Sequence, residues 1–119
     1  MSEFIVHLKD VFCLFGPFAA KRMFSGYGLF RDGLMFGLVS RDTLYLKADA
    51  QSAPRFTQLG QAQFEYRRKG KVAKLSYYAA PESVMEDAAE AACWARVAFE
   101  AALRAHTAKA KPRHDIRRR

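Results

Sequence analysis

The dipeptide Asp32-Gly33 is the feature that most constrains the fold of this chain. It stands between two apolar runs, a pattern typical of a two-residue hairpin turn in which both turn residues have positive φ. Such a turn predicts that Phe30 pairs with Met35 and that Gly28 lies opposite Gly37. Two facing glycines leave a shallow spot in a sheet, where we expect a helix to pack closely; the alternative is a ligand groove.

A second turn at Arg41-Asp42 extends this hairpin, so that residues 20–48 are predicted to form a three-stranded antiparallel meander. Side chains alternate across a strand, which gives the meander two faces. One face is wholly apolar and is expected to be core: Phe30, Met35, Val39, Leu44 and Leu46. The other is more apolar than a solvated face needs to be, so we expect a helix of the chain or a second subunit to cover it. Its members are the candidate partner-interface residues: Tyr27, Leu29, Phe36, Leu38 and Tyr45.

Residues 63–78 predict a second hairpin, with Lys69-Gly70 at its turn. This turn places Glu65 opposite Lys74, a favourable cross-strand charge pair. One face is predicted to be core: Phe64, Tyr66, Ala73, Leu75 and Tyr77. The tip is strongly basic, and a basic two-stranded ribbon can enter a major groove or bind phosphates. A lysine-rich tip also serves simply to prevent edge-to-edge association, and the sequence leaves both interpretations open. The candidate nucleic-acid contacts are Arg67, Arg68, Lys69, Lys71 and Lys74, with Arg117, Arg118 and Arg119 at the carboxyl end.

Three segments show helical spacing of apolar residues: Ser2 to Phe15, Asp49 to Leu59, and Asp87 to about His106. The predicted order is therefore α-β-β-β-α-β-β-α, an α+β fold in which helices flank an antiparallel sheet. Both cysteines, Cys13 and Cys93, fall in helical segments and are expected to be small buried side chains.

Charge is distributed unevenly along the 119 residues, whose net charge is +8. Residues 107–119 hold six Lys/Arg against one Asp, whereas residues 1–106 hold 14 basic against 11 acidic residues. We therefore expect one domain over residues 1–106, followed by a basic, disordered tail over residues 107–119. The sequence has no signal peptide, membrane-spanning run or zinc-ligand spacing, which favours a cytoplasmic protein without membrane contact, metal or other cofactor.

No catalytic constellation emerges from the sequence. The three histidines are scattered, and Gly26-Tyr27-Gly28 lacks both the third glycine and the helix of a dinucleotide fingerprint. Lys69-Gly70-Lys71 lacks the remaining residues of a P-loop. These observations predict a protein that is not an enzyme. The leading hypothesis is a regulatory module that works through protein contact near DNA, and the alternative is an interaction or chaperone-like module without a nucleic-acid role.

Several segments, in order and with the expected spacing, resemble the amino-terminal domain of the TfoX/Sxy competence regulators. They are Arg22 to Gly28, Asp32-Gly33, Phe36, Asp42 to Lys47, Ser76-Tyr77, Pro81 and Trp94. The resemblance implies an α-β3-α-β2-α layout related to YgaC and to secretion-chaperone-like folds. It also implies a bacterial cytoplasmic protein that regulates DNA-uptake genes together with an activator of the cyclic-AMP receptor type. The expected partners are thus a transcription activator or a second copy of the chain as a homodimer, with weak, non-specific nucleic-acid binding. We expect the second domain of the full competence regulators to be missing from this protein, with the basic tail in its place. The resemblance names no catalytic residue.

Overall fold

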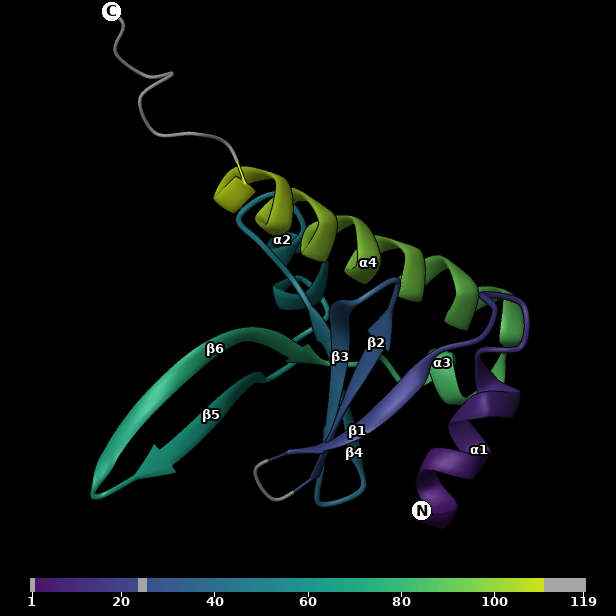
Figure 1. Ribbon diagram of the computed structural model, residues 1–119, viewed down its shortest axis with the longest axis horizontal. Helices are drawn as coiled ribbons and strands as arrows, with labels where there is room; N and C mark the ends of the chain where they lie inside the picture. The colour runs from purple at the N-terminus through teal and green to yellow at the C-terminus, as the bar shows by residue number, and fades with distance from the viewer. Residues whose placement is uncertain (1, 24–25, 111–119) are drawn as a thin grey trace, which may run out of the picture.

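A computed structural model describes residues 2–23 and 26–110 of the chain (Figure 1). Four helices lie on one face of a six-stranded sheet, and two of the strands leave the body as a long arm (Figure 1). The strands are β1 (Ala19–Met23), β2 (Gly26–Arg31), β3 (Leu34–Ser40), β4 (Thr43–Lys47), β5 (Gln63–Arg68) and β6 (Lys71–Ala79). The helices are α1 (Glu3–Val11), α2 (Ala53–Thr57), α3 (Ser83–Glu86) and α4 (Ala88–Ala110).

The sheet is antiparallel throughout, in the order β1-β2-β3-β4-β6-β5. This confirms the predicted α+β class and the antiparallel sheet flanked by helices. Two elements differ from the predicted order. The meander has four strands instead of three, because Ala19–Met23 pairs with β2 as a strand of its own. In addition, the segment after Pro81 includes the short helix α3.

The turn between β2 and β3 is the one that the sequence predicted. Asp32 and Gly33 have φ of 52° and 79°, and Phe30 pairs with Met35. Beyond that pair the register shifts by one residue, so that Leu29 lies opposite Gly37 and Phe36 is the extra residue of a β-bulge. The prediction that Gly28 faces Gly37 was therefore wrong, since Gly28 lies opposite Leu38.

The bulge changes which side chains form the core. Leu29 and Phe36 are fully buried beneath the helices, together with Val39, Leu44 and Leu46. Phe30 and Met35, which were predicted to be core, are only half-buried. A Cβ on Gly28 would meet the sulfurs of Met23 and Met35 and the ring of Phe30, which places these groups together on the face opposite the helices.

Helix α4 packs on β3 and β4 through a face of small side chains, which lets its axis approach the sheet closely. Its buried alanines are Ala91, Ala92, Ala95, Ala98, Ala101 and Ala102. Trp94 is half-buried beside this face, and its ring centre lies 5.0 Å from that of Phe56, so it covers the edge of the core. The prediction that Cys13 and Cys93 are buried was wrong, because both are exposed.

The start of α4 also agrees with the sequence. The Asp87 carboxylate accepts hydrogen bonds from the backbone amides of Ala89 and Glu90, which caps the helix. The helix continues to Ala110, beyond its predicted end at His106, so residues 107–110 are helical. The rest of the basic tail, residues 111–119, lies outside the described residues, as do positions 24 and 25 of the family motif.

Candidate functional site: the hairpin arm and its cleft

The arm formed by β5 and β6 is the part of the fold that projects farthest from the helices (Figure 1). It is attached at its base, where Tyr77 to Ala79 of β6 pair with β4. Its tip is the predicted turn, since Lys69 and Gly70 have φ of 52° and 78°. Glu65 lies opposite Lys74, which confirms the predicted register of the outer half of the arm.

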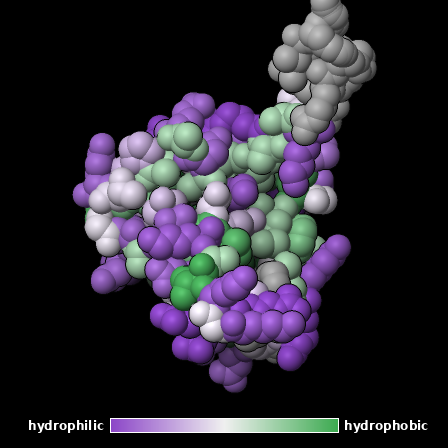
Figure 2. Space-filling model, turned by 90° about the vertical axis from the view of Figure 1, so that its left-hand side faces the viewer, coloured by the Kyte–Doolittle hydropathy of each residue, from purple (hydrophilic) through white to green (hydrophobic). Residues whose placement is uncertain are grey.

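Basic side chains gather on this outer half. All five candidates on the arm are exposed: Arg67, Arg68, Lys69, Lys71 and Lys74. Glu65 is the acidic residue among them, and it forms no ion pair with Lys74 in the described part of the chain. In the view onto the arm, hydrophilic side chains dominate the surface and surround a small apolar patch (Figure 2). The structure therefore brings these five candidates together, whereas Arg117, Arg118 and Arg119 lie outside the described residues.

A second, smaller apolar cluster holds the base of the arm on the face of the sheet opposite the helices. Its buried members are Leu38, Phe64 and Tyr77, and half-buried side chains surround them: Met35, Tyr45, Tyr66 and Leu75. This agrees with the predicted core face of the second hairpin except at Ala73, which is exposed. The cluster fixes the position of the arm relative to the body by side-chain packing as well as by strand pairing.

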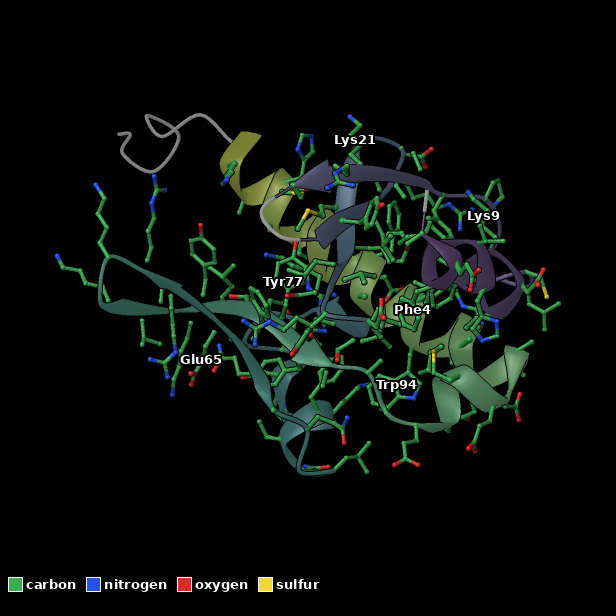
Figure 3. The ribbon with its side chains drawn as sticks, turned by 90° about the horizontal axis from the view of Figure 1, so that it is seen from below. Phe4, Lys9, Lys21, Glu65, Tyr77 and Trp94 are labelled. Carbon is green, nitrogen blue, oxygen red and sulfur yellow. The ribbon has the colours of Figure 1, made fainter. Side chains whose placement is uncertain are left out.

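Tyr77 lies at the centre of this attachment and points toward the body of the sheet (Figure 3). Burial raises the pKa of its phenol to about 12, and the hydroxyl donates a hydrogen bond of 3.4 Å to the Met35 carbonyl. The Lys47 ammonium stands 5.1 Å from the centre of the Tyr77 ring. Burial lowers the pKa of Lys47, the charge of Lys109 adds to this effect, and the charge of Asp49 opposes it.

A cleft of about 580 Å³ lies between the arm and the β3–β4 turn. One wall is a run of consecutive residues, 62–67, that includes most of β5. The other wall is formed by Ser40, Arg41, Thr43 and Tyr45. Sequence reasoning missed this cleft and Arg41 within it, because no local pattern shows that the arm curves back toward the β3–β4 turn. The available signal was the basic residue at a predicted turn, which is too common to single out a site.

The five candidate partner-interface residues do not form one surface. Leu29 and Phe36 are fully buried in the main core, and Tyr27 packs against that core from its edge. Leu38 and Tyr45 belong to the cluster at the base of the arm, on the opposite face. The expectation of one shared face was wrong because the bulge at Phe36 divides the set between the two faces.

No group of three or more His, Cys, Asp or Glu side chains in residues 2–23 and 26–110 is placed to hold a metal ion. None of the helices in that part of the chain is long and apolar enough to cross a membrane.

The six-stranded sheet, its helical layer and the basic arm define a small α+β domain with a projecting two-stranded ribbon. The chain belongs to the family of TfoX N-terminal domains, whose profile matches residues 10–102. A related protein is the DNA transformation protein TfoX1 of Aliivibrio fischeri, which is 34% identical over 76 residues. The match covers 60% of this chain but 36% of that relative, so the chain spans little more than a third of the relative's length.

Proposed function

We propose that this protein is a non-enzymatic, cytoplasmic regulatory module that controls the expression of DNA-uptake genes by contacting a transcription activator. The tip of its arm adds weak, sequence-independent contacts to DNA phosphates. Membership of the TfoX N-terminal domain family and the similarity to a DNA transformation protein support the regulatory role.

The observation that carries the DNA contact is the position of the basic side chains. Arg68, Lys69 and Lys71 are exposed at the end of an arm that stands clear of the body (Figure 1). No other helix or strand of residues 2–23 and 26–110 lies beside this tip to prevent approach to a duplex. Lysine and arginine contacts to phosphate position a protein on DNA but carry no sequence information. The contact therefore contributes affinity and orientation, and the choice of gene comes from the protein partner.

The experiment measures how the affinity for a fluorescein-labelled 20-base-pair duplex depends on salt. Each phosphate contact releases condensed counterions, so log K should fall by about 0.9 per contact for each tenfold rise in salt. Replacing both Arg68 and Lys71 by Ala should reduce the slope by about 1.8, and a duplex of unrelated sequence should bind equally well.

The matched control is the double change Arg55→Ala with Arg96→Ala, which removes the same charge from exposed sites on α2 and α4. This variant should keep the slope of the parent protein. An affinity that does not depend on salt, or an equal slope in the arm variant and the parent, would overturn the DNA contact. The interaction or chaperone-like alternative, with no nucleic-acid role, would then be the better account of the arm.

A further inference from the structure

We propose that the cleft between β5 and the β3–β4 turn binds an extended, acidic segment of a partner protein, which adds as a strand to the free edge of β5. This proposal deepens the proposed function. It takes from that function a single assumption, which is that the partner is a protein.

The lining of the cleft shows that it follows the edge of the strand. Successive side chains of a strand point to opposite faces of the sheet, so a pocket on one face is lined by every second residue. Here residues 62–67 line the cleft without a gap. Glu65, Tyr66 and Arg67 lie in the regularly paired part of β5, where side chains alternate between the two faces. A cavity that all three residues line therefore reaches the edge of the strand, where their backbone is accessible. Strand β5 is a terminal strand of the sheet, so this edge has no neighbouring strand among the described residues.

The outward backbone groups of β5 follow from its register. Arg68 pairs with Lys71 across the two-residue turn, and Tyr66 pairs with Ala73. In an antiparallel hairpin, pairs that exchange hydrogen bonds alternate with pairs that do not, and the pair that closes a two-residue turn exchanges them. The amides and carbonyls of Glu65 and Arg67 therefore point away from β6, toward the free edge. An added strand would satisfy donors and acceptors alternately, which is how strand addition provides affinity.

The curvature of the arm turns this edge into a groove with a second wall. The pairing of β5 with β6 shifts register between Gln63 and Glu65, and such irregularities bend and twist a sheet. The ring centres of Tyr45 and Phe64 are 4.8 Å apart, and this aromatic contact joins the two walls. The cleft is thus bounded by packed side chains, and a strand lying in it would be held against the β3–β4 turn.

Charge complementarity favours an acidic occupant. Arg41 stands on one wall and Arg67 on the other, and both are exposed. Against these two arginines the lining holds one acidic residue, Glu65. Asp42 follows Arg41 in the sequence but does not line the cleft. Glutamate or aspartate on the incoming strand would meet the two arginines that line the cleft.

Two other occupants fit these observations less well. A second copy of β5 would bring Arg67 and Arg68 against their counterparts, and basic edges of this kind oppose edge-to-edge pairing. A single-stranded nucleic acid would supply phosphate acceptors to the arginines. Its backbone has no donors comparable to amides, so the carbonyls of Glu65 and Arg67 would remain without partners.

The test uses the full chain and a fluorescein-labelled ten-residue peptide of alternating glutamate and valine, with binding followed by fluorescence anisotropy. We expect it to bind more tightly than the same peptide with lysine in place of glutamate. Two further peptides carry N-methyl groups on one or the other set of alternate residues. Only one edge of an added strand pairs with β5. Methylation of the amides on that edge should therefore abolish binding, and methylation of the other set should leave binding unchanged. On binding, hydrogen exchange should slow at the amides of Glu65 and Arg67.

Arg41→Asn with Arg67→Gln should weaken peptide binding about tenfold, or about 1.4 kcal/mol. Asparagine suits the positive φ of 52° at position 41. The control Arg55→Ala with Arg96→Ala should bind as the parent does. The Arg68→Ala, Lys71→Ala protein should keep most of its peptide affinity while its DNA salt slope falls, so failure of one proposal is distinguishable from failure of the other.

Three results would overturn the cleft proposal. The first is equal binding of the acidic and basic peptides, or no binding of either. The second is that both N-methylated peptides bind, or that both fail to bind, while hydrogen exchange at the amides of Glu65 and Arg67 does not slow. The third is tighter binding of a ten-residue oligothymidylate in competition with the peptide, or self-association that the Arg41→Asn, Arg67→Gln change abolishes, which would assign the cleft to nucleic acid or to a second copy.

Discussion

Arg104 on α4 forms a two-point ion pair with Asp49, which lies two residues after the end of β4. Its Nε donates to Oδ2 at 2.6 Å and its Nη2 donates to Oδ1 at 3.0 Å. The same carboxylate accepts from the amides of Gln51 and Ser52, and from the hydroxyl of Ser52. One side chain therefore connects the last long helix with the turn that leads into α2. The hydrogen bond from Arg104 is the main cause that lowers the pKa of Asp49 to about 2, and the hydrogen bonds from Ser52 contribute further.

Asp49→Asn should lower the free energy of unfolding at pH 7 by about 1 kcal/mol. The full pKa shift, from 3.8 to about 2, would correspond to about 2.4 kcal/mol, but the Arg104 side chain is 38% exposed and solvent screens the pair. Since the pKa of Asp49 is lowered on folding, this contribution is complete above about pH 4 and is lost as pH falls toward 2. Urea unfolding at several pH values measures the difference between the two proteins, which should shrink over that range.

The control for this prediction is Asp42→Asn, an exposed turn residue whose φ of 56° asparagine also tolerates. It should leave the free energy of unfolding within about 0.5 kcal/mol of the parent. The difference in the free energy of unfolding between Asp49→Asn and the parent should shrink as pH falls. If that difference stays constant from pH 5 to pH 2, the ion pair does not contribute through its charge.

Phe36→Ala should destabilise the protein by about 3–5 kcal/mol, because the ring is fully buried among Phe12, Phe15 and Phe18. Met35→Ala should cost about 1 kcal/mol, since its side chain is half-buried on the opposite face. Urea unfolding of both variants measures the contrast. Without a bulge, strict alternation would place Met35 in the core and Phe36 on the opposite face. A larger loss of unfolding free energy for Met35→Ala than for Phe36→Ala would therefore contradict the observed register.

The β-bulge at Phe36 also shows what could not be predicted from the sequence. Alternation and turn chemistry were enough to predict both hairpins, because the positive φ values at the turns favour particular residues. A bulge leaves no comparable signal, since both Met35 and Phe36 are apolar and either could face the core. One inserted residue moves every side chain beyond it to the other face, which is why the five candidate interface residues were grouped wrongly.

The candidate site divides in the same way. The basic tip of the arm was predictable, because the turn and the charges are local in sequence. The cleft was not, because its two walls are about 20 residues apart along the chain and meet only through the curvature of the arm. The exposure of Cys13 was also missed: α1 ends at Val11, so Cys13 lies in the turn that follows the helix and not on its buried face.

Two glycines should differ in their response to the same substitution. A Cβ on Gly26 would lie 1.7 Å from the carbonyl oxygen of Val39, so Gly26→Ala must push β2 away from β3. We expect a loss of at least about 3 kcal/mol. Gly33→Ala meets nothing within 4 Å and bears only the strain of a φ of 79°, about 1–2 kcal/mol. Thermal and urea unfolding measure both losses, and equal losses would show that the close approach of the two strands is not what requires Gly26.

Tyr77→Phe should change how stability depends on alkaline pH. Burial raises the pKa of the Tyr77 phenol to about 12, against about 10 in an unfolded chain. A raised pKa contributes stability that is complete below pH 10 and is lost as pH rises toward 12, because the unfolded chain loses its proton first. The parent should therefore lose about 2 kcal/mol over this range relative to Tyr77→Phe.

At pH 7 the Tyr77→Phe variant should match the parent within about 0.5 kcal/mol, because the hydrogen bond that it removes is long at 3.4 Å. The aromatic ring remains, so the contact with the Lys47 ammonium and the packing of the arm are retained. Urea unfolding at intervals from pH 9 to pH 12 gives the two curves. If they run parallel, the phenol is not buried in solution, and the arm is attached more loosely than its packing around Tyr77 indicates.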